Sequence, residues 1–254
     1  MPSTSLKRRI RALAEKYESP EFLMGDPGSF MHRYSEVRDI EVVAFFAACL
    51  AFGKRSEILS HIEKLLQMMG NQSPSDWLRS GSYRDSLPDS PASFYRIFSY
   101  RSLHLACKTL GGILEQHVTI GDCLKGEFLR GECRNHPGRL ATLLASRFPE
   151  GCSPLVPKGE QSANKRLNLF LRWMVRCDSP VDLGLWPWYP ASELIMPLDT
   201  HVLAVARQFG LMPSNASADL KHAIALTEAM KQIFPKDPVK GDFALFGYGI
   251  DTGI

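Results

Sequence analysis

The stretch DIEVVAFFAACLAFG, residues 39–53, limits the possible folds more than any other part of this sequence. Its apolar residues fall on every side of a helix rather than along one stripe, as they do in a helix that other elements surround. The rest of the chain must therefore supply packing partners on several sides. With 254 residues, of which 44% are apolar, the chain is long enough to build such a core.

Helical periodicity also dominates the remaining sequence, because apolar residues recur at spacings of three and four. Runs that alternate apolar and polar residues are scarce, and no segment repeats at a fixed period. We predict an all-α fold, a single domain over residues 1–254 in which two helical lobes can form around a cleft near residues 162–202. Helices are expected at residues 5–17, 39–53, 56–70, 75–79, 93–116 with a break near Tyr100, 137–148, 163–176, 200–209, 217–233 and 239–248.

Composition and charge exclude several classes of protein. No stretch approaches the roughly 18 consecutive apolar residues of a membrane span, and the basic N-terminus lacks the apolar core of a signal peptide. The six cysteines form no C-x-x-C pair and match neither zinc nor iron–sulfur spacing. We therefore expect reduced thiols, a cytoplasmic protein with no membrane partner, and neither a metal nor another cofactor. The net charge of +3 is compatible with nucleic acid bound at a local basic face.

Asp199 stands at the start of a predicted helix in SELIMPLDTHVLAVARQFGL, residues 192–211. Pro197 and Leu198 favour an extended entry, which places the carboxylate at the N-cap position before Thr200. A cap of this kind contributes about 1 kcal/mol and is the commonest role of such an aspartate. The alternative is that the carboxylate also serves in catalysis.

A second segment, SANKRLNLFLRWMVR over residues 162–176, carries four cations and no acidic residue. Lys165 and Arg166 fall in the first turn of the predicted helix, where the helix dipole disfavours positive charge. Either both side chains are simply exposed to solvent, or an anionic partner compensates them. Arg172 is expected on the same polar face as Lys165.

The sequences KRLN (165–168) and PLDTHV (197–202) are similar to two motifs of the helix-hairpin-helix DNA glycosylases. In that superfamily, a helix opens with a lysine in a K-T-A-N-like pattern, and a V-D-T-H-V-like stretch supplies an aspartate at a later helix start. The long segment between Lys165 and Asp199 is closest in spacing to the archaeal 8-oxoguanine glycosylase branch. Together with HRYSEVRDIEVVAFFAACLAFGK and DPVKGDFALFGYG, the two motifs also resemble a bacterial family of uncharacterised proteins over most of the chain.

The resemblance implies a two-lobed helical bundle that acts on damaged duplex DNA. Lys165 would attack the sugar of an oxidised or otherwise damaged nucleotide, and Asp199 would stabilise the positive charge that develops there. Candidate phosphate-binding residues are Arg166, Arg172, Thr200, His201, Lys54 and Arg55, and candidate base-pocket residues are Phe52, Tyr100, Trp186 and Trp188.

Each candidate has a structural alternative. Thr200 and His201 are also ordinary residues of a helix start, residues 51–56 can form a plain corner between two helices, and tryptophans between prolines commonly pack within a loop. For the whole protein, the alternatives are a non-catalytic nucleic-acid-binding module on the same scaffold and a nucleoside N-glycosidase.

Overall fold

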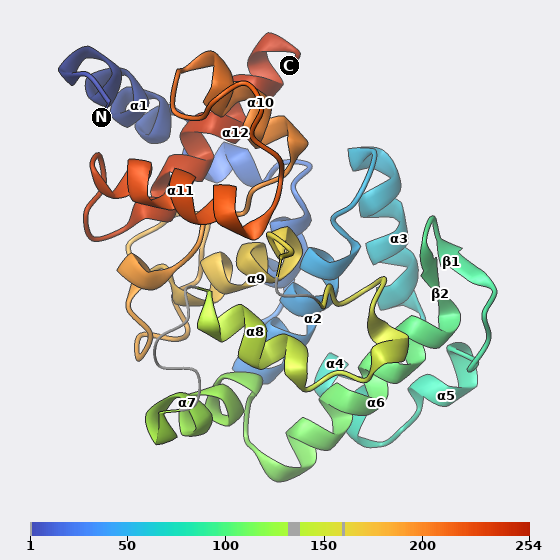
Figure 1. Cartoon of the computed structure of the whole chain (residues 1–254). Coiled ribbons are helices and arrows are strands. Elements are labelled where there is room, and N and C mark those ends of the chain that lie inside the picture. The colour runs from blue at the N-terminus through green and yellow to red at the C-terminus, as the bar shows by residue number, and fades with distance from the viewer. Residues whose placement is uncertain (1, 132–137, 159–160) are drawn as a thin grey trace. The chain divides into compact units, whose positions relative to one another are not determined.

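The computed structural model describes residues 2–131, 138–158 and 161–254. The chain divides into two compact units, which we call the first unit, Met1–Met24 with Gly159–Ile254, and the second unit, Gly25–Lys158. The predicted all-α class is confirmed, since helices dominate both units and one two-stranded sheet is all the sheet structure in the described residues (Figure 1). None of the described helices is both long and apolar enough to cross a membrane.

The second unit is built around the helix that the apolar stretch predicted. Its elements are η2 (Pro27–Arg33), α2 (Val37–Leu50), α3 (Arg55–Gln67), α4 (Pro74–Arg79), α5 (Tyr83–Ser86), β1 (Ser93–Tyr95), β2 (Phe98–Ser99), α6 (Tyr100–Gln116), α7 (Ile120–Arg130), α8 (Arg139–Ser146) and η3 (Glu150–Cys152). Every residue of α2 from Asp39 to Leu50 is buried. Helices η2, α3, α4 and α7 all contact it, which gives α2 the packing partners that its composition demands.

Two buried carboxylates of α2 hold the N-termini of neighbouring helices. Asp39 Oδ1 accepts a hydrogen bond of 2.8 Å from the Ser75 amide in the first turn of α4. The fully buried Glu41 accepts hydrogen bonds from the amides of Ile120, at 2.6 Å, and Gly121, at 3.2 Å, at the start of α7. The first amides of a helix have no partner within the helix, and its dipole favours a negative charge there. Thus α2 fixes where α4 and α7 begin.

The predicted helix over residues 93–116 is wrong in its first seven residues. Strands β1 and β2 form an antiparallel hairpin there, with Arg96 in a left-handed conformation (φ 52°) at the turn. The Ser99 hydroxyl accepts a hydrogen bond of 3.1 Å from the Ser102 amide and so caps α6, which starts at Tyr100. The expected break near Tyr100 is therefore the real start of the helix.

The first unit consists of α1 (Thr4–Tyr17), η1 (Pro20–Leu23), α9 (Lys165–Val175), η4 (Ala191–Glu193), α10 (Thr200–Gln208), α11 (Leu220–Lys231), η5 (Pro238–Lys240) and α12 (Gly241–Thr252). Helix α12 packs against both α1 and α10, and Figure 1 shows the blue α1 close to the red α12. A Cβ at Gly247 would overlap the ring of Tyr17, so a glycine lets α1 and α12 approach closely. Helix α9 is buried on all sides from Leu167 to Val175.

No disulfide joins the five cysteines of the described residues, and Cys133 lies outside them.

Candidate active site

Lys165 and Asp199 come together in the first unit. Lys165 is the first residue of α9, and Asp199 is the N-cap residue of α10. The lysine Nζ lies 3.5 Å from Asp199 Oδ2, and the two side chains are 25% and 30% exposed. A molecule that approaches from solvent can therefore reach both groups.

The two oxygens of Asp199 face different partners. Oδ1 accepts a hydrogen bond of 2.9 Å from the Val202 amide, the normal contact of an N-cap aspartate. Oδ2 is the oxygen that faces Lys165. Helix capping thus occupies only Oδ1, and Oδ2 remains available to interact with Lys165.

The turn before Lys165 is held by polar contacts. Asn164 has a left-handed backbone (φ 45°), and its amide donates to Ser162 Oγ at 3.1 Å. Asn168, which the resemblance singled out, is buried and donates from Nδ2 to the Ala163 carbonyl at 2.8 Å. Asn168 therefore ties the helix to the turn that precedes it and so fixes where Lys165 begins α9.

Asp242 is a third charged group of this site, and sequence analysis missed it. It lies in the first turn of α12 and is only 4% exposed. Its Oδ2 accepts a hydrogen bond of 2.5 Å from Arg172 Nη1, whereas its buried Oδ1 has no hydrogen-bond partner among the described residues. Burial raises the pKa of Asp242 to about 6; the positive charges of Arg172 and Lys165 oppose the rise, and the Asp199 carboxylate adds to it. The Lys165–Asp199 pair and Asp242 thus influence one another electrostatically.

The predicted role of Arg172 in phosphate binding does not fit its position. Its side chain is 2% exposed and donates to Asp182 Oδ1 at 3.3 Å as well as to Asp242. Arg176, one turn later, is equally buried and pairs with Asp182, with Asp237 at 2.7 Å and with Glu18 at 2.7 Å. The cations of α9 that lack acidic neighbours in sequence are therefore compensated by carboxylates from other segments of the first unit.

The other candidates near the start of α10 differ in exposure. Arg166 is half-buried, and Thr200 is exposed at the first position of the helix. The His201 ring lies 5.5 Å from the Phe246 ring, and its buried Nε2 has no hydrogen-bond partner in the described part of the chain. A Cβ at Gly249 would come 2.5 Å from that nitrogen. His201 therefore packs against α12, while Arg166 and Thr200 keep a surface that a phosphate can approach.

The two tryptophans of the insert lie side by side. Trp186 is 1% exposed, contacts Phe170 of α9 edge-on at 5.4 Å, and stacks on Trp188 at 5.8 Å. Trp188 is only half-buried. Trp186 is thus a packing residue, and Trp188 is the member of the pair with a surface for a ligand.

The remaining candidates belong to the second unit. Phe52 is 42% exposed, Lys54 and Arg55 are also exposed, and Tyr100 is half-buried. The Phe52 carbonyl accepts a hydrogen bond of 2.9 Å from the Tyr95 hydroxyl, which ties the corner between α2 and α3 to the β-hairpin. The structure therefore gives this corner a defined shape with an aromatic side chain and two cations on its surface.

No group of three or more histidines, cysteines, aspartates and glutamates within the described residues is arranged to hold a metal ion. The chemistry that the first unit offers is that of an amine next to one carboxylate, with a second, buried carboxylate that interacts electrostatically with both. A lysine amine that loses its proton is a nucleophile toward an electron-poor carbon, and carboxylates stabilise positive charge as it forms there.

Residues 26–251 match the family described as "Protein of unknown function (DUF2400)". The chain belongs to this family. The match includes Lys165, Asp199 and Asp242, and the family's description assigns no activity to them. No curated protein matches the chain, and no solved structure does.

Proposed function

We propose that this protein is a DNA N-glycosylase that removes an oxidised or otherwise damaged base and cleaves the strand at the resulting site. The observation that supports this proposal is the 3.5 Å approach of Lys165 Nζ to Asp199 Oδ2 at a partly exposed position. Two groups that lie 34 positions apart in sequence meet at two helix starts, as the reaction requires.

In the proposed reaction, Asp199 takes the proton of the Lys165 ammonium and leaves a neutral amine. The amine attacks C1′ of the damaged nucleotide, the glycosidic bond breaks, and the base leaves with the bonding electrons and takes up a proton. The attached nitrogen then loses a proton while the C1′–O4′ bond breaks and O4′ takes up a proton, which yields a Schiff base between C1′ and Lys165. A proton next leaves C2′ as the C3′–O bond breaks, and the 3′ phosphate departs with the bonding electrons. Water finally releases the lysine.

The second carboxylate supports the same chemistry. Arg172 pairs with Asp242 at 2.5 Å, and the remaining influence of Asp242 on the Lys165–Asp199 pair is electrostatic. Because Asp242 is held in place before the reaction starts, its negative charge favours positive charge on the sugar as it forms nearby. On the DNA side, Arg166 and Thr200 supply the contacts to phosphate.

The test is reductive trapping on a panel of duplexes that carry single lesions. Wild-type protein with borohydride should form a covalent complex with at least one duplex, whereas Lys165→Gln should form none. Asp199→Asn should lower base release by about 10²- to 10³-fold, the effect of removing one preorganised electrostatic group. Asparagine caps helices as well as aspartate does, so this variant should fold normally.

Lys236→Gln is the matched control, because this lysine is exposed and lies outside the site in the same unit. It should trap DNA as well as the wild type. Trapping by Lys165→Gln, or a wild type that releases no base from any duplex of the panel, would refute the proposal. Salt-sensitive binding without base release would identify a nucleic-acid-binding module instead.

A further inference from the structure

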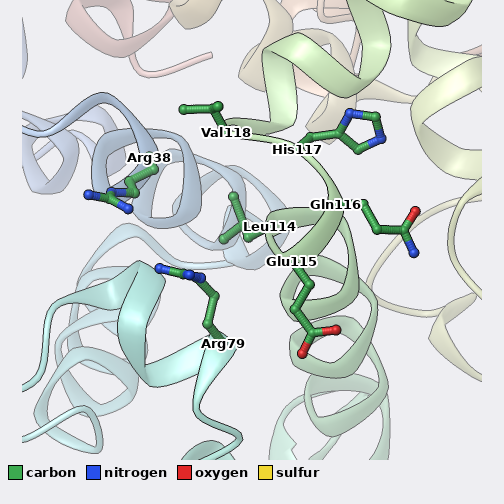
Figure 2. A pocket seen from close by; sticks show the side chains of 7 residues that line it. All are labelled: Arg38, Arg79, Leu114, Glu115, Gln116, His117 and Val118. Atoms are coloured by element: carbon green, nitrogen blue, oxygen red, sulfur yellow. The ribbon is translucent and has the colours of Figure 1, made fainter.

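The second unit contains a hollow of about 320 Å³ beside the C-terminal end of α6. Arg38 reaches it from α2 and Arg79 from α4, while Leu114, Glu115 and Val118 line it from α6 and the segment that follows (Figure 2). All of these residues lie within Gly25–Lys158, so the hollow belongs to this unit alone. It is independent of the Lys165–Asp199 pair, which lies in the first unit.

The two arginines bring positive charge to the hollow, and Glu115 is the acidic residue among those that line it. No ion pair involves Arg38 in the part of the chain that the structure describes. Arg79 pairs with Asp76 of its own helix at 3.6 Å, with both side chains largely exposed to water. Exposed pairs of this kind are weak. Two guanidinium groups thus line one hollow, where a bound anion can pair with both.

Buried contacts hold the helices that carry the arginines. The Asp39–Ser75 hydrogen bond of 2.8 Å joins α2, next to Arg38, to the start of α4. Helices α4 and α6 approach so closely that a Cβ at Gly111 would come 2.8 Å from the Leu78 carbonyl oxygen. The helices that carry Arg38 and Arg79 therefore have a fixed spacing in the absence of a ligand.

The segment around Val118, which forms the rim of the hollow, is also held by a buried hydrogen bond. Val118 is 75% exposed and precedes Ile120, whose amide donates to the buried Glu41 at 2.6 Å. Leu114, by contrast, is buried in the wall. The hollow thus offers an apolar strip next to the two guanidinium groups.

We propose that this hollow binds the phosphoryl group of a small phosphate ester. Two guanidinium forks match the charge and the oxygen geometry of a phosphate dianion. The apolar strip of Leu114 and Val118 suits the organic part of the ester, and the volume fits a small ligand. The carboxylate of Glu115 on the same wall disfavours a long polyanion, so a ligand with one phosphoryl group fits better than a nucleic acid.

The test measures binding by calorimetry at low ionic strength with three probes: inorganic phosphate, a nucleoside 5′-monophosphate and the same nucleoside without phosphate. The variants are Arg38→Gln and Arg79→Gln, which remove one charge each at exposed positions and leave the core intact. Lys108→Gln is the control, because this lysine is an exposed cation of α6 outside the hollow.

Wild-type protein should bind the monophosphate at one site and the unphosphorylated nucleoside not at all. Each arginine variant should bind about tenfold more weakly or worse, and Lys108→Gln should bind like the wild type. Equal affinity for inorganic phosphate and the monophosphate would assign the site to the phosphoryl group alone, and tighter binding of the monophosphate would assign it to the ester.

Three results would overturn the proposal. One is the absence of saturable binding of either phosphate probe at millimolar concentration. The second is unchanged affinity in both arginine variants. The third is arginine-dependent binding of a DNA oligonucleotide by a protein that ignores the mononucleotide, because that outcome would make the hollow part of a nucleic-acid surface.

Discussion

Asp242→Asn should make the stability of the first unit depend less on pH. The pKa of Asp242 is raised by burial from 3.8 to about 6. A difference of about two pH units between the folded and unfolded pKa corresponds to about 3 kcal/mol. Because the folded pKa is the higher one, the folded state holds a proton that the unfolded chain has already released. Asp242 therefore favours folding at low pH, and this contribution is lost as the pH rises from about 4 to about 6.

The assay is urea denaturation of wild type and variant at several pH values between 4 and 7.5, followed by tryptophan fluorescence. Three of the four tryptophans lie in the first unit, so the signal reports mainly on that unit. Asparagine does not titrate, so the stability of the variant should lack the pH dependence that Asp242 gives to the wild type. The difference in unfolding free energy, variant minus wild type, should then increase by about 2 kcal/mol from pH 4 to pH 7.

Asp251→Asn is a control for which the stability difference should change with pH in the opposite direction. Hydrogen bonds from Lys16 and Tyr17 lower the pKa of this exposed carboxyl, so its contribution to stability should fall as the pH drops. The corresponding difference for this variant should be small and should change in the other direction. A difference for Asp242→Asn that stays constant from pH 4 to pH 7, or that decreases, would refute the burial argument.

Two further substitutions test other parts of the structure. Arg172→Met should destabilise the first unit by about 3–5 kcal/mol in urea denaturation, because it leaves buried carboxylates without their partner; a loss below about 1 kcal/mol would mean that those acids are already neutral. Gly53→Ala should lower the melting temperature more than Gly70→Ala does. Both glycines have positive φ, at 114° and 59°, but only at Gly53 would a Cβ meet other atoms at 2.9 Å, and equal effects would contradict the described turn.

Much of the helical architecture could be predicted from periodicity. The strong apolar pattern over residues 163–176 corresponds to α9 at Lys165–Val175, and the pattern over 200–209 corresponds to α10 at Thr200–Gln208. The aromatic residues of the 93–99 segment suit a helix and a strand alike, so the sequence there does not exclude a helix. The hairpin there depends on a left-handed Arg96 and on cross-strand hydrogen bonds, which helical periodicity does not reveal.

The candidate site was predictable only in part. The positions of Lys165 and Asp199 at two helix starts followed from local signals, namely an uncompensated cation and a cap after proline. Asp242 could not be found in this way, because the partner of its carboxylate, Arg172, lies 70 positions earlier and its own neighbours in sequence are aromatic and small. The burial of Arg172 was missed for the same reason, since the acids that neutralise it come from other segments.

The discontinuity of the first unit has a consequence for synthesis on the ribosome. Helix α1 emerges before the whole of Gly25–Lys158, yet its partner α12 is translated only after that unit. Ile10 and Ala14, fully buried in the finished protein, therefore stay exposed while the second unit can already fold. The nascent chain thus presents an unpaired amphipathic segment until α12 has been synthesised, and such exposed apolar surface is prone to aggregation.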